Sequence, residues 1–197
     1  MGSDTLGDDE AGDQGRALRV RAFFGLPLPE EHRAALGSYL LGRYATLPKF
    51  RWTRQENLHI TLKFLGHVER DLAERIAGHV EAASPRGFVL QLGGLDSFKR
   101  GKLARVLWLG LKLGGDDVKA LAALIDEQSA LEGLEAEKRP YHPHLTLARS
   151  RRLEGAPVPG VFSPDLPPWK ADELILYRSQ LGRSGPVYEP LRTIRLR

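Results

Sequence analysis

A short motif, His-x-Thr-Leu, occurs twice in this 197-residue chain. The first copy lies in residues 59–66 (HITLKFLG) and the second in residues 144–149 (HLTLAR). Both segments are rich in Ile, Leu, Thr and Phe, which fit a pleated and half-buried surface, so both are expected to be β-strands. Each strand must bury one face in a core while it presents histidine and threonine on the other. This pairing is the strongest constraint on the fold.

Successive side chains of a strand point to opposite faces. We therefore expect His59, Thr61 and Lys63 on one face of the first strand, and His144 and Thr146 on one face of the second. Histidine changes charge near neutral pH, so one histidine can accept a proton while the other donates one. Threonine offers a hydroxyl donor to an anionic oxygen. A single copy would indicate only a polar strand face, but two copies favour an acid–base site around a phosphate.

The order of the other expected elements repeats around the two motifs. Strands are predicted at 19–26, 87–95, 106–113, 172–181 and 188–196, helices at about 29–43, 69–83 and 116–133, and a long loop at 150–170. Strand, helix and motif strand follow one another in residues 19–66 and again in residues 106–149. This repeat predicts two similar lobes that face each other across a cleft and bring His59 and His144 together.

The composition bounds the compartment and the partner. Residues 1–16 are acidic and glycine-rich, so we expect a disordered tail followed by one domain over residues 17–197. The net charge is +4 even with that acidic tail, and a basic domain favours RNA or DNA as a partner. Cysteine is absent, which excludes disulfides and thiol catalysis. No apolar run is long enough to span a bilayer, so we expect a cytoplasmic monomer without membrane contact.

The residues around the two motifs carry a family resemblance. Residues 57–66 (NLHITLKFLG), 139–149 (RPYHPHLTLAR) and 176–179 (LYRS) resemble the RNA 2′,3′-cyclic phosphodiesterases, historically named 2′-5′ RNA ligases, of the 2H phosphoesterase superfamily. The resemblance covers roughly residues 18–196. It implies an α+β, bilobal fold with antiparallel sheets lining a central cleft and helices outside.

The resemblance also implies an activity. The expected reaction is metal-independent opening of a 2′,3′-cyclic phosphate at an RNA 3′ end to leave a 2′-phosphate, with no cofactor. In reverse, the enzyme would join a 5′-hydroxyl to that end through a 2′-5′ linkage. By similarity, His59 donates a proton to the leaving oxygen and His144 activates water. Thr61 and Thr146 would hold the non-bridging oxygens. Chemistry alone leaves the order of the two histidines open.

Further substrate contacts are expected around this core. Arg149 matches an arginine of the family, but simple alternation places it on the face opposite His144, so a bulge or strand end would be needed to turn it inward. Lys63 lies on the correct face by alternation. Phe23 and Tyr141 are candidates for stacking on a base. His32 falls on an expected helix without a partner pattern and is predicted at the surface.

Two other functions remain open at this level. A non-catalytic module that binds RNA 3′ ends would use the histidines only to grip phosphate, and turnover separates it from the enzyme. A metal-dependent phosphohydrolase is suggested by the pair His142 and His144, since two histidines can form half of a metal site. Activity that survives chelation would exclude it.

Overall fold

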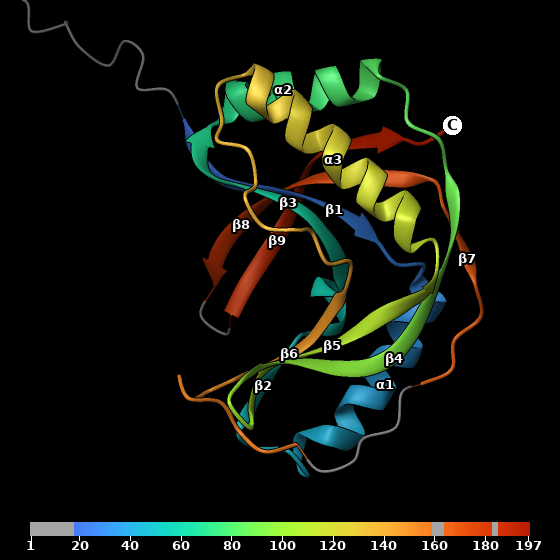
Figure 1. The fold of residues 1–197 in the computed structure, drawn as a ribbon, viewed down its shortest axis with the longest axis vertical. Coiled ribbons are helices and arrows are strands. Elements are labelled where there is room, and N and C mark those ends of the chain that lie inside the picture. Colours follow the sequence, from blue (N-terminus) through green and yellow to red (C-terminus); the bar gives the residue numbers. More distant parts are fainter. Residues whose placement is uncertain (1–17, 159–163, 183–184) are drawn as a thin grey trace, which may run out of the picture.

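The computed structural model describes residues 18–158, 164–182 and 185–197 (Figure 1). The strands are β1 (Arg19–Pro27), β2 (Phe50–Trp52), β3 (His59–Glu69), β4 (Phe88–Arg100), β5 (Leu103–Leu113), β6 (Leu145–Ser150), β7 (Trp169–Ala171), β8 (Glu173–Gly182) and β9 (Gly185–Arg195). The helices are α1 (Glu30–Tyr44), η1 (Gln55–Asn57), α2 (Arg70–Ala82) and α3 (Gly115–Leu131). The α+β class predicted from the sequence is confirmed. The predicted acidic tail, and part of the predicted long loop, lie outside the described residues.

The sheet consists of two antiparallel halves that meet at the two motif strands. The strand order is β7-β4-β5-β6-β3-β1-β8-β9, with β2 paired to β6. Strands β6 and β3 pair through Ile60 and Leu145, the residues between histidine and threonine in the two motifs. The sheet curls around this narrow seam, and Figure 1 shows the two halves turning away from each other on either side of it. The motifs therefore lie at the centre of the concave surface.

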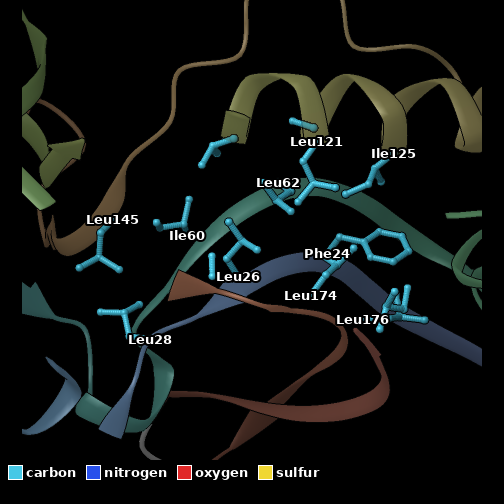
Figure 2. Packing of buried hydrophobic residues seen from close by; sticks show 14 of the residues in the cluster. Phe24, Leu26, Leu28, Ile60, Leu62, Leu121, Ile125, Leu145, Leu174 and Leu176 are labelled. Carbon is cyan, nitrogen blue, oxygen red and sulfur yellow. The ribbon is translucent and has the colours of Figure 1, made fainter. Parts of the chain in front are cut away.

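Helices α1 and α3 each pack across to the other half of the sheet, away from the strand that precedes them. Helix α1 connects β1 to the segment leading into β3, yet it packs near β7, where the ring of His32 lies 4.8 Å from that of Trp169. Helix α3 connects β5 to β6, yet Leu121 and Ile125 pack over Leu62 of β3 (Figure 2). This exchange closes one continuous apolar core behind the concave face.

The prediction for His32 is wrong. Its side chain is 1% exposed, and its Nε2 lies 2.9 Å from the carbonyl oxygen of Pro167. The helix face that carries His32 covers the other lobe instead of facing water, and a single helix sequence does not reveal that crossing. Within the described residues, none of the helices is long and apolar enough to span a membrane.

Two predicted strand ends move for local reasons. The segment between the strands predicted at 87–95 and 106–113 is mostly strand, because β4 and β5 stay paired up to Arg100 and Leu103. Gly101 has a positive φ of 59° and allows a tight turn there. Strand β3 likewise continues past Gly66, whose φ of 76° accompanies a register shift against β1. The hairpin of β4 and β5 thus extends further along the sheet than the sequence indicated.

Candidate active site

The antiparallel seam sets the relation between the two motifs. Ile60 lies opposite Leu145, and their side chains point into the core. Continuing this register by one residue on each side places His59 opposite Thr146 and Thr61 opposite His144. Each histidine therefore neighbours the threonine of the other motif, and all four side chains belong to the concave face.

A bulge follows the threonine in the first motif. Against β1, Thr61 pairs with Gly25 and Lys63 with Phe24, which leaves Leu62 as an extra residue. An extra residue resets the alternation of the side chains that follow it.

The second motif has a bulge at the equivalent position. Against β5, Thr146 pairs with Trp108 and Ala148 with Leu107, so Leu147 is the extra residue. Leu147 and Ala148 are both fully buried, although simple alternation would expose one of them. The bulge that Arg149 needs to turn inward is therefore present. The two motifs share one backbone device as well as one sequence.

The bulges change which side chains reach the site. Lys63 forms an ion pair with Asp126 of α3, and it lines one pocket together with Thr61 and His144. Phe64 takes the place expected for Lys63, with its ring 5.6 Å from that of Phe23 and its side chain 59% exposed. Strict alternation is therefore wrong beyond Thr61. Arg149 is the equivalent of Phe64 in the second motif, and it lines a pocket together with His59 and Thr146.

The imidazole of His59 is held in one orientation. Its Nδ1 lies 2.7 Å from the carbonyl oxygen of Asn57, and since a carbonyl only accepts, Nδ1 carries the hydrogen. Its Nε2 then has a free lone pair, which accepts a hydrogen bond of 2.9 Å from the hydroxyl of Thr61. The buried amide of Asn57 in turn donates to the carbonyl oxygen of Pro186 at 2.7 Å. The reactive nitrogen of His59 therefore faces the concave surface.

Aromatic rings enclose His59. Phe23, Tyr177 and Tyr188 lie with ring centroids 4.9, 6.0 and 5.2 Å from the imidazole. Phe23 is only 1% exposed and stacks on Tyr177. Its ring therefore packs against His59 and has almost no exposed surface on which a base could stack. The pKa of His59 is lowered from its ordinary 6.5 to about 4, chiefly by burial. The positive charges of Arg149 and His144 act in the same direction, and the hydrogen bond to Asn57 opposes them.

His144 repeats the same backbone contact in a more open setting. Its Nδ1 donates to the carbonyl oxygen of His142 at 2.7 Å, as His59 donates to the residue two positions before it. The rings of Phe98 and Trp108 flank it, with centroids at 5.0 and 5.8 Å. Burial lowers the pKa of His144 as well, and the nearby charges of His142 and Arg149 act in the same direction. Because both pKa values lie below the ordinary 6.5, both histidines are mainly neutral at pH 7 in the free enzyme.

Each threonine carbonyl is held by the segment that leads into the other motif. The phenol of Tyr141 donates to the carbonyl oxygen of Thr61 at 2.6 Å. The hydroxyl of Thr53 donates to the carbonyl oxygen of Thr146 at 3.0 Å. These carbonyls lie beside the two bulges, where the sheet ladder is interrupted, and the hydroxyls satisfy them. Burial raises the pKa of Tyr141, so its phenol stays protonated and remains a donor.

Arginines gather on the His59 side of the seam. In the pairing of β2 with β6, Arg51 lies directly opposite Arg149. Like charges directly opposite each other destabilise a sheet, and within the described residues neither guanidinium forms an ion pair. Both also act on Tyr188. Burial raises the pKa of Tyr188, and the charges of Arg149, Arg21 and Arg51 act in the opposite direction. This arrangement is suited to an anion.

Sequence reasoning missed several of these residues. Arg51, Asn57 and Tyr188 reach the site through pairings between distant segments, and no local pattern marks them. Arg51 stood within a basic and aromatic run, but its strand β2 is only three residues long. The histidines and threonines of the two motifs are brought together, and Lys63 lines the pocket of Thr61 and His144 while it pairs with Asp126 of α3. No group of three or more histidine and carboxylate side chains able to hold a metal occurs in the described part of the chain.

Comparison with known proteins is consistent with this geometry. Residues 31–183 match the family model of the 2′-5′ RNA ligase superfamily. An RNA 2′,3′-cyclic phosphodiesterase of Escherichia coli (strain K12) is 30% identical over 175 residues, which cover 87% of this chain and 94% of that protein. One from Bacillus subtilis (strain 168) is 32% identical over 181 residues, covering 88% and 95%. The crystal structure of E. coli LigT complexed with 3′-AMP is similar with a TM-score of 0.77 and 27% identity over 91% of this chain and 99% of that one.

Proposed function

The chain belongs to the 2′-5′ RNA ligase superfamily, and from this premise we propose that it is an RNA 2′,3′-cyclic phosphodiesterase. The observation that carries the proposal is the crossed arrangement of the two motifs, which puts two oriented imidazoles and two hydroxyls around one point of the concave face. Two relatives that are 30% and 32% identical to this chain are named RNA 2′,3′-cyclic phosphodiesterases.

The reaction follows from the positions of these groups. His144 takes a proton from water as its oxygen attacks the phosphorus of the cyclic phosphate. The bond from phosphorus to the 3′-oxygen breaks, and His59 gives its proton to that oxygen, which leaves a 2′-phosphate. Each proton transfer is worth ~10²–10⁴-fold in rate. Thr61, Thr146 and Arg149 stabilise the charge on the non-bridging oxygens.

The arginines support RNA as the substrate, and they help to assign which histidine is the acid and which is the base. A cyclic end of RNA carries a further phosphodiester on the 5′ side of its ribose. Arg51 lies beside Arg149 in the pocket of His59, where this phosphodiester would be neutralised. The ribose and its 3′-oxygen then lie nearest His59, which suits that residue as the acid.

The pKa values of the free enzyme would instead favour His144 as the acid. His59 has the more strongly lowered pKa, so the unliganded site would place a proton on His144 first. Position outweighs this order, because an acid must lie beside the leaving oxygen, whereas a bound phosphate anion favours the charged form of both histidines and offsets the charge of Arg149. We therefore keep His59 as the acid.

One assay tests the function. A short RNA that ends in a 2′,3′-cyclic phosphate is incubated with the protein in EDTA, and the position of the product phosphate is determined. We expect a 2′-phosphate, formed without added metal. RNA that binds tightly but is not turned over would contradict the enzyme and favour a binding module. Turnover that EDTA abolishes and metal restores would favour a metal-dependent phosphohydrolase.

A further inference from the structure

A cavity of about 490 Å³, called here the distal cavity, takes no part in the chemistry proposed above. Its walls come from the end of β1, the start of α1, helix η1, the segment from β7 into β8, and β9. It adjoins the pocket that holds His59, Arg51, Arg54 and Arg149, called here the arginine pocket. The arginine pocket measures only about 120 Å³, which is below the ordinary range of small-molecule sites, whereas the distal cavity lies within that range. The distal cavity is therefore large enough for a nucleoside.

Two features connect the distal cavity with the arginine pocket. Tyr188 lines both, and its ring stands at 90° to the imidazole of His59, with 5.2 Å between the centroids. Arg54 lines the arginine pocket, and its guanidinium lies 3.6 Å from the carboxylate of Glu56, which lines the distal cavity. A strand of RNA that leaves the arginine pocket past Arg54 and Tyr188 therefore enters the distal cavity next.

The walls of the distal cavity suit a base. The half-buried rings of Tyr177 and Tyr188 line it, and Phe23 holds both from behind, with centroids 5.1 and 4.9 Å away. Burial raises the pKa of Tyr177 to about 12, so its phenol stays protonated and remains a hydrogen-bond donor. Pro27 and Pro190 add apolar surface. An aromatic ring fixed in this way is a stacking surface, and stacking accepts any base.

The charges of the distal cavity indicate which part of a nucleotide it takes. Its basic side chains, Arg33 and Lys170, are outnumbered by carboxylates. These carboxylates belong to Glu56, Asp172 and Glu173. The arginine pocket, by contrast, has no carboxylate among its described lining residues. A base is neutral, and its amino groups can donate to a carboxylate. Phosphate groups are therefore drawn to the arginine pocket, and a base is the part that suits the distal cavity.

We propose that the distal cavity binds the base of the nucleoside next to the cyclic end, on its 5′ side. The inference rests on the proposed function and adds a length preference to the same site, for RNA ends of at least two nucleosides. The cyclic phosphate lies between the two motifs, and the phosphodiester on the 5′ side of its ribose lies at Arg51 and Arg54. The preceding base then stacks on Tyr188. No bond forms or breaks in the distal cavity, so its occupant contributes binding and position only.

The test compares the hydrolysis of three donors that end in a 2′,3′-cyclic phosphate. They are a mononucleotide, a dinucleotide, and the same dinucleotide with no base on its 5′ nucleoside. The two dinucleotides carry the same phosphodiester, so the ratio of their kcat/KM values isolates the contribution of the base. We expect the wild type to prefer the complete dinucleotide by about 5- to 100-fold, as for stacking of one base. The mononucleotide reports changes at the motifs themselves.

Three variants locate the base. Tyr188→Leu removes a ring from the distal cavity, so we expect the two dinucleotides to become nearly equal, whereas Tyr188→Phe keeps the ring and should retain the preference. Tyr188 also packs against His59, and damage to His59 lowers the rate with all three donors and cancels in the ratio. Phe64→Leu is the matched control, because it removes an exposed ring from the pocket of His144, and it should keep the wild-type ratio.

The outcomes separate the two proposals. Equal kcat/KM for the complete and the abasic dinucleotide in the wild type would overturn this inference and leave the proposed function intact. A preference that survives in Tyr188→Leu, or that is lost in Phe64→Leu, would also overturn it, since the base would then lie elsewhere. Absence of hydrolysis with every donor would overturn the proposed function and this inference together.

Discussion

The two copies of the motif share their backbone and differ in their surroundings. Both histidines donate Nδ1–H to the carbonyl two residues earlier, and both motifs carry a bulge after the threonine. His59 is enclosed by three aromatic rings, whereas His144 lines a pocket of about 470 Å³ together with Thr61 and Phe64. Five positions after the histidine, one motif presents Phe64 and the other presents Arg149.

This difference shows how a repeated element acquires two roles. The backbone orients two imidazoles in the same way, so both can transfer a proton through Nε2. The residue that follows each bulge then distinguishes the sides: Arg149 places a guanidinium in the pocket of His59, and Phe64 places an aromatic ring in the pocket of His144. A duplicated motif is therefore compatible with a reaction in which the attacking oxygen and the leaving oxygen need different surroundings.

The strongest test of the shared backbone is removal of each imidazole. His59→Asn and His144→Asn should each lower kcat by ~10²–10⁴-fold, because each loses one proton transfer. Steady-state kinetics on the cyclic-phosphate RNA measure the effect, and His67→Asn, an exposed histidine at the far end of β3, serves as the control. Near-wild-type kcat in either motif variant would mean that only one copy acts.

The next test separates the sides. Arg149→Gln should lower kcat by ~10²–10³-fold, because a charged donor to the developing phosphoryl charge is lost. Arg51→Gln should instead raise KM for RNA more than for a cyclic mononucleotide, which lacks the upstream phosphodiester. Arg86→Gln, an exposed arginine on the segment after α2, is the control. Equal effects of Arg51→Gln on both substrates would place Arg51 at the reacting phosphate.

The pH dependence of the rate tests the protonation states of the two histidines. The pair is productive when it carries one proton, and the apparent pKa values belong to the pair. For kcat/KM, which reports the free enzyme, activity should fall as the pH drops below about 4, because a second proton adds to the pair. Activity should fall again as the pH rises through the lowered pKa of His144, which lies below the ordinary 6.5, because the single proton is then lost. The profile of kcat should move to higher pH, because bound phosphate favours the protonated imidazoles.

Arg149→Gln offers an internal check on this profile. The charge of Arg149 lowers the pKa of both histidines, so its removal should move both limbs of the kcat/KM profile to higher pH. A kcat/KM optimum that stays above pH 7 in the wild type would contradict the effect ascribed to burial.

The smallest expected effects concern the two hydroxyls beside the bulges. Tyr141→Phe and Thr53→Val each remove the donor to a motif carbonyl, and each should lower the free energy of unfolding by about 1–3 kcal/mol if the carbonyl is left unsatisfied. Denaturant unfolding measures the loss, and Thr193→Val, at an exposed position of β9, is the control for removal of a hydroxyl. Stability unchanged in both variants would mean that water replaces the hydroxyls.

The sequence was informative wherever a local pattern carried the signal. The motif strands, the three long helices and the meeting of His59 with His144 could all be predicted, because periodicity and the internal repeat report them. The bulges at Leu62 and Leu147 could not, since an extra residue is defined only by the partner strand. Without them, the ion pair of Lys63 with Asp126 was hidden and the orientation of Arg149 stayed open.

Residues that depend on contacts between the lobes were equally hidden. His32 lies on a helix whose buried face is decided by the crossing of α1 to the other lobe. Arg51 enters the site through a short strand that forms only because β6 pairs with it. Neither fact has a signature in the neighbouring residues, and both follow once the sheet order is known.

The division of labour between the histidines can be tested directly with a donor whose 3′-oxygen is replaced by sulfur. A thiolate leaves without receiving a proton, so the loss of the acid no longer matters, whereas the loss of the base still does. If His59 protonates the leaving oxygen, His59→Asn should open this cyclic thio-substrate at nearly the wild-type rate, and His144→Asn should remain ~10²–10⁴-fold slower. Recovery of His144→Asn instead, or of neither variant, would contradict the assignment of His59 to the leaving oxygen.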